Sequence, residues 1–138
     1  MNLTNTSRYA IRILSFMAIQ ESKLVSAKFL VEKLNISDKY LRSLMTLLAK
    51  RGLIHSIQGR DGGYEINKPL NELYLIEIIQ AVENIDKYLG CVLGFPECSD
   101  ENPCALHHKW ATIKDETYLF MSKTTLENIV KDRSILKF

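Results

Sequence analysis

Residues 26–64 read SAKFLVEKLNISDKYLRSLMTLLAKRGLIHSIQGRDGGY, and this stretch predicts two helices joined by a tight turn and followed by a β-hairpin. Each helix follows a serine, Ser26 or Ser37, whose hydroxyl can accept a hydrogen bond from a free backbone N–H of the first turn. The first helix should end near Asn35, and Gly52 should terminate the second. The two helices are therefore separated by only a short turn.

The second helix of this pair has one apolar and one polar face. On a helical wheel its leucines and Met45 gather on one side, which indicates the side that faces the core. The opposite side is polar, basic and small, as expected for a helix that enters the major groove of DNA. The residues that we expect to contact DNA are Lys39, Tyr40, Arg42, Ser43, Thr46 and Lys50 of this helix, and Arg60 of the hairpin turn.

The segments around the helix pair complete a recognisable module. Apolar stretches at residues 53–58 and 64–67 flank a glycine-rich turn at residues 59–63, which predicts a hairpin. A helix over residues 7–20 precedes the pair. Helix, helix-turn-helix and hairpin, in that order, form a winged helix-turn-helix. We therefore predict a mainly α protein with a winged helix-turn-helix DNA-binding domain over residues 1–68, whose wing has two β-strands.

The charge distribution also favours a polyanionic partner. Of the 138 residues, 18 are Lys or Arg and 16 are Asp or Glu. Residues 1–68 contain 11 basic and 5 acidic residues, for a net charge of +6, whereas residues 69–138 contain 7 and 11, for a net charge of −4. This asymmetry indicates that double-stranded DNA binds the first part, although the charges could also simply cover solvated faces.

The composition excludes several other classes of protein. With 46% apolar residues the chain is too apolar to be disordered. No apolar run reaches the ~18 to 20 residues that span a bilayer, because Arg12 and Ser15 interrupt residues 11–19. This segment also lacks the cleavage site of a signal peptide, so we expect a cytoplasmic protein with no membrane partner. We expect no enzyme, because no nucleophile is paired with a base and no phosphate-binding loop is present.

The second part of the chain, residues 69–138, predicts a helix over residues 73–82, a long loop over residues 84–103 and a long helix from Cys104. Compact domains rarely contain so long a loop without a functional reason. The long helix carries an apolar stripe with little core left to cover it, which favours a partner subunit as the cover. We therefore expect a homodimer whose C-terminal dimerisation helix contributes Leu106, Trp110, Ile113 and Phe120 to the interface.

The long loop and the start of the helix after it carry a candidate metal site. The cysteines are spaced C-x6-C-x5-C at Cys91, Cys98 and Cys104, and His107 follows three residues later, on the same helical face as the last cysteine. Thiolates and imidazoles bind iron-sulfur clusters and zinc, and these wide spacings fit a cluster better than a C-x2-C zinc knuckle. Two alternatives stay open: three buried cysteines with no cofactor, and a cluster-free thiol switch at Cys104.

Several short motifs run along the whole chain: MNLT at residues 1–4, SRYA at 7–10, Tyr40-Leu41, GLI at 52–54, GRDGGY at 59–64 and the three cysteines. In these motifs the chain resembles the winged-helix bacterial regulators that include the iron-sulfur cluster regulator (IscR) and the nitric-oxide-sensing repressor (NsrR). The resemblance implies a homodimeric transcriptional regulator, expected to be a repressor, that binds a pseudo-palindromic DNA site. It also implies that the three cysteines hold a cluster that senses nitric oxide, oxygen or iron-sulfur status.

Two departures from the family pattern bear on the site and on the operator. Regulators of the NsrR type use an acidic residue of the first helix as the fourth ligand of the cluster. This chain has SRY at residues 7–9 of that helix, without a carboxylate. The IscR type has a histidine at the place of His107. The resemblance therefore implies a 2Fe–2S cluster, rather than a 4Fe–4S cluster, with Cys91, Cys98, Cys104 and His107 as ligands. Arg42 and Ser43 replace an acidic residue and an amide of IscR, so the operator is not carried over.

Three alternatives stay open at this point. His107 could cap or hydrogen-bond in a site whose fourth ligand comes from the partner subunit or a small molecule. The chain could be a cluster-free regulator that is switched by cysteine oxidation or by a protein partner. A small iron-sulfur electron-transfer protein would also use a cluster, but it would not need a basic helix-turn-helix and a wing.

Overall fold

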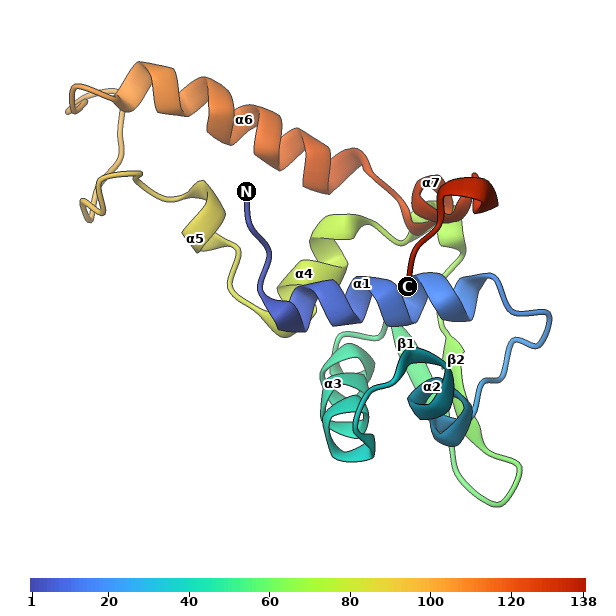
Figure 1. Ribbon diagram of the computed structural model, residues 1–138. Coiled ribbons are helices and arrows are strands. Elements are labelled where there is room, and N and C mark those ends of the chain that lie inside the picture. Colours follow the sequence, from blue (N-terminus) through green and yellow to red (C-terminus); the bar gives the residue numbers. More distant parts are fainter.

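The chain folds as three helices, a β-hairpin and a second group of helices (Figure 1). The computed structural model describes residues 1–138 apart from the side chain of Ile135. The first part consists of α1 (Asn5–Ala18), α2 (Ala27–Leu34), α3 (Asp38–Lys50), β1 (Ile54–Ile57) and β2 (Gly63–Ile66). The second part consists of α4 (Leu75–Val82), α5 (Asp86–Leu89), α6 (His107–Lys123) and α7 (Leu126–Val130), with short 3-10 turns at Leu70–Glu72 and Arg133–Ile135. The predicted mainly α winged helix-turn-helix with a two-stranded wing is confirmed.

The helix pair begins and ends where the sequence predicts. Ser26 and Ser37 each accept a hydrogen bond from the backbone N–H three residues later, at 3.1 and 3.2 Å. Asn35, after α2, has a left-handed φ of 52°, and Gly52, after α3, has a φ of 73°. Asparagine and glycine tolerate a positive φ, and the chain can therefore leave the helix at each of these residues.

The wing is fastened to the start of α2. Val25 and Tyr64 exchange two backbone hydrogen bonds, of 2.9 and 2.8 Å. A Cβ atom on Gly63 would lie only 2.4 Å from the carbonyl oxygen of Val25, so the close approach requires glycine. At the far end of the hairpin, Gly62 N–H donates to the carbonyl of Gly59, whose φ is 108°. The hairpin is therefore fixed at its base and closed by glycines at its tip.

One core joins the two parts of the chain. Figure 1 shows α1 lying between α2, α3 and the wing on one side and α4, α6 and α7 on the other. The core that contains Ile13 of α1 and Leu44 of α3 also contains Ile78 of α4 and Leu126 of α7. The long helix α6 packs chiefly on α4 and α5 and extends beyond this core. Residues beyond 68 thus share one core with residues 1–68. The helix α6 lies outside most of this core and has an uncovered face.

Two details of the second part differ from the sequence prediction. The predicted loop over residues 84–103 contains the short helix α5. The long helix begins at His107 rather than at Cys104, which lies in a preceding turn where its carbonyl accepts the N–H of His107 at 3.1 Å. Helix ends commonly form such 3-10-type turns, so the boundary shifts by a few residues while the two side chains still leave the same turn.

A buried carboxylate ties the start of α1 to the end of α4. Glu83 accepts hydrogen bonds from Thr4 Oγ1 at 2.9 Å, from Tyr88 OH at 3.1 Å and from Ser7 Oγ, and it pairs with Lys87. Its side chain is only 8% exposed. Burial alone would raise the pKa of Glu83, but the hydrogen bonds from Lys87, Ser7, Thr4 and Tyr88 together outweigh burial and lower the pKa to about 2.

The free energy of unfolding should therefore fall as the pH is lowered from 4.5 toward 2. In this window Glu83 stays ionised in the folded protein, whereas the unfolded chain, with an ordinary pKa of 4.5, takes up the proton. The difference between the two pKa values corresponds to roughly 3 kcal/mol. Denaturant unfolding across the window should show this loss in the wild type and in Glu21→Gln, an exposed control. Glu83→Gln should lack most of it, and an unchanged pH dependence in that variant would contradict the assignment.

Candidate functional site

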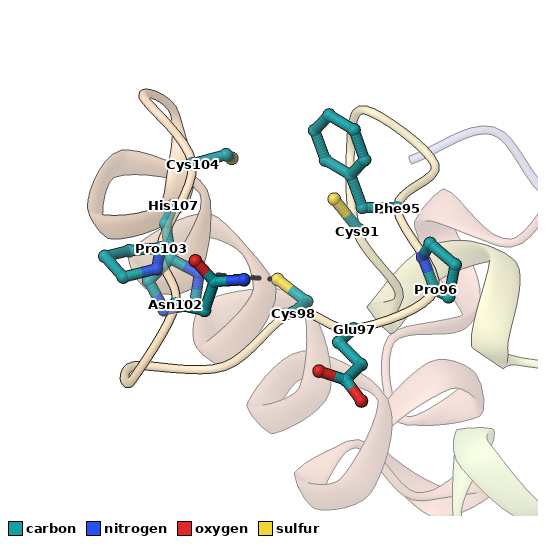
Figure 2. Close-up of a pocket in the computed structure, with 9 residues that line it drawn as sticks. All are labelled: Cys91, Phe95, Pro96, Glu97, Cys98, Asn102, Pro103, Cys104 and His107. Carbon is teal, nitrogen blue, oxygen red and sulfur yellow. Dashed lines mark hydrogen bonds between the residues drawn. The ribbon is translucent and has the colours of Figure 1, made fainter.

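Four side chains from the loop region surround one cavity of about 560 Å³ (Figure 2). Figure 2 shows Cys91 on the segment after α5, Cys98 in the middle of the loop, Cys104 on the segment just before α6 and His107 at the start of α6. All three cysteines are free thiols. The structure thus brings the four predicted ligands to one place. The other residues that line the cavity are Phe95, Pro96, Glu97, Asn102 and Pro103.

The Cys91 thiol lies against backbone N–H groups of the following turn. The N–H of Phe95 favours the thiolate and lowers the pKa of Cys91; burial opposes this effect, and the N–H of Leu93 and a hydrogen bond with Cys98 add to it. The turn is closed by Gly94, whose N–H donates to the Cys91 carbonyl at 3.0 Å and whose φ is 77°. Hydrogen bonds of this kind stabilise the anionic sulfur that a metal requires.

The Cys98 thiol faces the imidazole of His107. Burial raises the pKa of Cys98, and the neighbouring Cys91 raises it further. The sulfur lies 3.4 Å from His107 Nδ1, and His107 Nε2 lies 2.8 Å from Oδ1 of Asp100. His107 is only 5% exposed. A buried imidazole with one nitrogen toward a ligand position and the other on a carboxylate is typical of metal-binding histidines.

The donor atoms fit an iron-sulfur cluster better than a single closely held ion. Among the side chains that the structure describes, the group with three possible ligand atoms within 4.8 Å of one another is Asp100, His107 and His108, and it contains no sulfur. The three sulfurs instead line a cavity, as ligands of a polynuclear group would. Thiolates bind iron-sulfur clusters, and imidazole can replace thiolate as a ligand of the iron in them.

Asp100 and His108 were missed as site residues in the sequence. His108 is exposed, and its ring lies edge-on to that of His107 with centroids 5.3 Å apart. Asp100 lies in an irregular loop, seven residues before the histidine that it contacts. No periodicity relates two such positions, so the only signal was the presence of a carboxylate in a loop with other ligand-type residues.

A second candidate surface lies on α3 and the wing. Arg42, Thr46 and Lys50 of α3 line a groove with Ser56, Gln58 and Tyr64 of the wing. The predicted DNA contacts that are exposed are Lys39, Arg42, Ser43, Thr46, Lys50 and Arg60. Arg42 Nε donates to Asp38, one turn earlier, at 2.9 Å. The groove therefore combines a helix face with the edge of the hairpin.

Tyr40 differs from the other predicted DNA contacts. Its ring is half-buried and lies edge-on to Tyr9 of α1, with centroids 5.5 Å apart. Its hydroxyl lies 3.4 Å from Oγ1 of Thr6. Most of the Tyr40 side chain thus packs α3 against α1, which sequence periodicity on a single helix does not reveal.

The long helix α6 exposes an apolar stripe. Leu106, Ile113 and Phe120 are 42%, 52% and 52% exposed and recur every seven residues. This spacing is typical of paired helices. Trp110, predicted in the same stripe, is half-buried, and its Nε1–H donates to the Gly90 carbonyl at 2.7 Å, so it anchors α6 to its own chain.

Within the described residues, none of the helices is long and apolar enough to cross a membrane.

Comparisons with known proteins found a matching family model, similar sequences and similar structures. The family model Rrf2, described as an iron-dependent transcriptional regulator, matches residues 3–132. The chain is 32% identical over 138 residues to the HTH-type transcriptional regulator IscR of Photorhabdus laumondii, covering 99% of this chain and 83% of that protein. It is similar in structure to CymR, the global cysteine regulator of B. subtilis (TM-score 0.76, 26% identity, 95% and 97% of the two chains). T. potens IscR, at 20% identity, shares the fold (TM-score 0.76, 100% and 93% of the two chains).

Proposed function

The chain belongs to the Rrf2 family of transcriptional regulators, and from this premise we propose that its DNA binding is controlled by a 2Fe–2S cluster held by Cys91, Cys98, Cys104 and His107. The relatives are regulators and not enzymes. The observation that carries the proposal is the cavity that these four side chains line, with His107 buried and its Nδ1 directed at Cys98.

The DNA-binding part of the proposal uses α3 and the wing. The polar face of α3 enters the major groove, and Arg60 at the wing tip reaches the adjacent backbone. The protein acts as a homodimer that presents two α3 helices to a pseudo-palindromic site, with half-sites about 34 to 36 Å apart. The exposed stripe on α6 supports this arrangement, because a second copy of α6 would cover it.

The residues of the cavity have distinct tasks in the cluster site. When bound, the cluster supplies an iron centre that reacts with nitric oxide or oxygen. The backbone N–H groups after Cys91 lower the pKa of that thiol, which favours the thiolate form that a metal requires. Asp100 accepts a hydrogen bond from His107 Nε2–H, which leaves the Nδ1 lone pair for the site. Because the loop continues directly into α6, gain or loss of the cluster alters the start of the dimerisation helix.

Anaerobic purification tests the proposal. We expect brown protein with sulfide-to-iron absorbance, two iron and two sulfide per protomer, and an operator affinity that changes when the cluster is removed. The operator is obtained by selecting bound duplexes from a random pool. Colourless protein that resists reconstitution and binds its operator normally would contradict the proposal.

A second candidate function is favoured by the similarity to CymR. Here the protein is a cluster-free regulator, switched by cysteine oxidation or by a protein partner. The supporting observation is that Cys91 and Cys98 are both free and line the same cavity. Colourless protein whose operator affinity changes on treatment with an oxidant, and recovers with a thiol reductant, would favour this function.

Base reading by Arg42 leads to a specific prediction. Arg42→Ala should weaken operator binding by about 1 to 3 kcal/mol, with a smaller effect on random duplexes, because arginine can contact guanine through two hydrogen bonds. Lys50→Ala is the matched control, since a phosphate contact should affect both duplexes equally and lower the log-log salt slope by about 0.9. Fluorescence anisotropy over a salt series measures both. Equal losses on the two duplexes for Arg42→Ala would make it a phosphate contact instead.

A further inference from the structure

We propose that, when the iron-sulfur cluster is absent, Asp100, His107 and His108 bind one divalent transition-metal ion such as Fe²⁺ or Zn²⁺. The three ligand-type atoms lie within 4.8 Å of one another. This set shares His107 with the cluster site, but it uses the opposite nitrogen of the ring. It gives a role to two residues, Asp100 and His108, that the cluster site does not use as ligands.

The geometry already holds most of this site in place. His107 Nε2 and Asp100 Oδ1 are 2.8 Å apart, so an ion needs only a small movement to enter between them. The buried His107 ring is fixed, whereas His108 and Asp100 are exposed and can adjust. The His108 ring stands edge-on to His107, and its ligand-type nitrogen lies within 4.8 Å of a carboxylate oxygen of Asp100. The site therefore consists of one rigid ligand and two adaptable ones.

The donor atoms select a class of metal. Two imidazole nitrogens and one carboxylate oxygen suit Fe²⁺, Co²⁺ or Zn²⁺, whereas Mg²⁺ and Ca²⁺ prefer ligands that are all oxygen. Three protein ligands leave positions open for water. The sulfur of Cys98 lies on the other side of the His107 ring, 3.4 Å from Nδ1, and with the ion on Nε2 it would accept a hydrogen bond from Nδ1–H.

The two sites exclude each other, and this step rests on the proposed function. A neutral imidazole has one nitrogen lone pair to give and carries its proton on the other nitrogen. With the cluster on Nδ1, the proton is on Nε2 and is donated to Asp100; with the divalent ion on Nε2, the proton is on Nδ1 and is donated to Cys98. His107 thus serves one metal centre at a time, and its tautomer follows from which of the two centres is bound.

Cobalt titration of the cluster-free full-length protein tests the site, with Co²⁺ as the probe. We expect one Co²⁺ per protomer and visible ligand-field bands without an intense sulfur-to-cobalt charge-transfer band. His108→Gln and Asp100→Asn should each weaken binding at least about tenfold. Glu101→Gln, a carboxylate change in the same loop, and His55→Gln, a histidine on the wing, should bind as the wild type does. An intense charge-transfer band, or unchanged binding by His108→Gln, would overturn the site.

Reconstitution separates this inference from the proposed function. His108→Gln should take up the cluster normally, because His108 is not one of its ligands, and cluster-loaded wild type should bind no Co²⁺. Cluster formation without Co²⁺ binding to the cluster-free protein would refute the divalent site and leave the proposed function standing. Co²⁺ binding by a protein that cannot be reconstituted with a cluster would refute the proposed function and leave the divalent site standing. Full Co²⁺ binding by the cluster-loaded protein would overturn the exclusion between the two sites.

Discussion

Replacing Ile113 and Phe120 together by glutamate is expected to make the protein monomeric and to weaken operator binding by roughly 10²- to 10⁴-fold. The two side chains are half-exposed on one stripe of α6, where a paired helix would bury them. Charges at these positions would repel the same charges on the partner. A monomer then binds each half-site separately and loses the high effective concentration that the linked second α3 provides.

Sedimentation velocity and anisotropy with operator DNA measure the two effects. Asn71→Glu with Gln80→Glu is the matched control, because it adds the same charge at exposed positions outside α6. Circular dichroism should show that both double variants keep the helical fold. A stable dimer in the α6 variant would mean that this stripe is not the interface. A monomer with unchanged operator affinity would mean that dimerisation does not drive DNA binding.

Changes at His107 should have the second largest effect. His107→Ala should lose its cluster at least about tenfold faster than the wild type, because one ligand is gone. His107→Cys should retain the cluster, with the spectrum of an all-thiolate site and a reduction potential lower by on the order of 100 mV or more. The thiolate adds a negative charge where the neutral Nδ1 of His107 faces Cys98. Anaerobic absorbance, iron release and potentiometry measure these changes.

His108→Gln is the control for His107, since it alters the adjacent histidine while keeping the four proposed ligands. It should leave the spectrum and the potential unchanged. If His107→Ala and His107→Cys both hold the wild-type cluster with the wild-type spectrum, His107 is not a ligand. The 2Fe–2S assignment would then lose its main support, and a fourth ligand from the partner subunit or a small molecule would replace it.

The parts of the fold that could be predicted are those with local signals. Ser26 and Ser37 cap helices by bonding N–H groups three residues away, and Gly52 ends a helix through its own φ. Glu83 gave no such signal, because its partners Thr4 and Ser7 lie 79 and 76 residues away in the sequence. Tertiary contacts over such distances follow from how helices pack, and no pattern within one helix reports them.

For the candidate site, the sequence predicts which side chains come together and not what surrounds them. Spacing and resemblance together suggest the three cysteines and His107 as ligands, and the structure places these four side chains around one cavity. Asp100 was missed because a loop has no period that would bring it to His107. Trp110 has helical spacing with the exposed stripe, yet a carbonyl of another segment, at Gly90, fixes its ring.

The tight junction between Val25 and Gly63 has a consequence for the proposed DNA-binding mode. Two main-chain hydrogen bonds and a contact that admits only glycine fasten the wing to the segment before α2, so α3 and the wing would meet DNA in one fixed arrangement. In the proposed dimer, the separation and rotation of the two DNA-binding modules would remain adjustable. The spacing between half-sites would then matter for recognition as well as the bases within them.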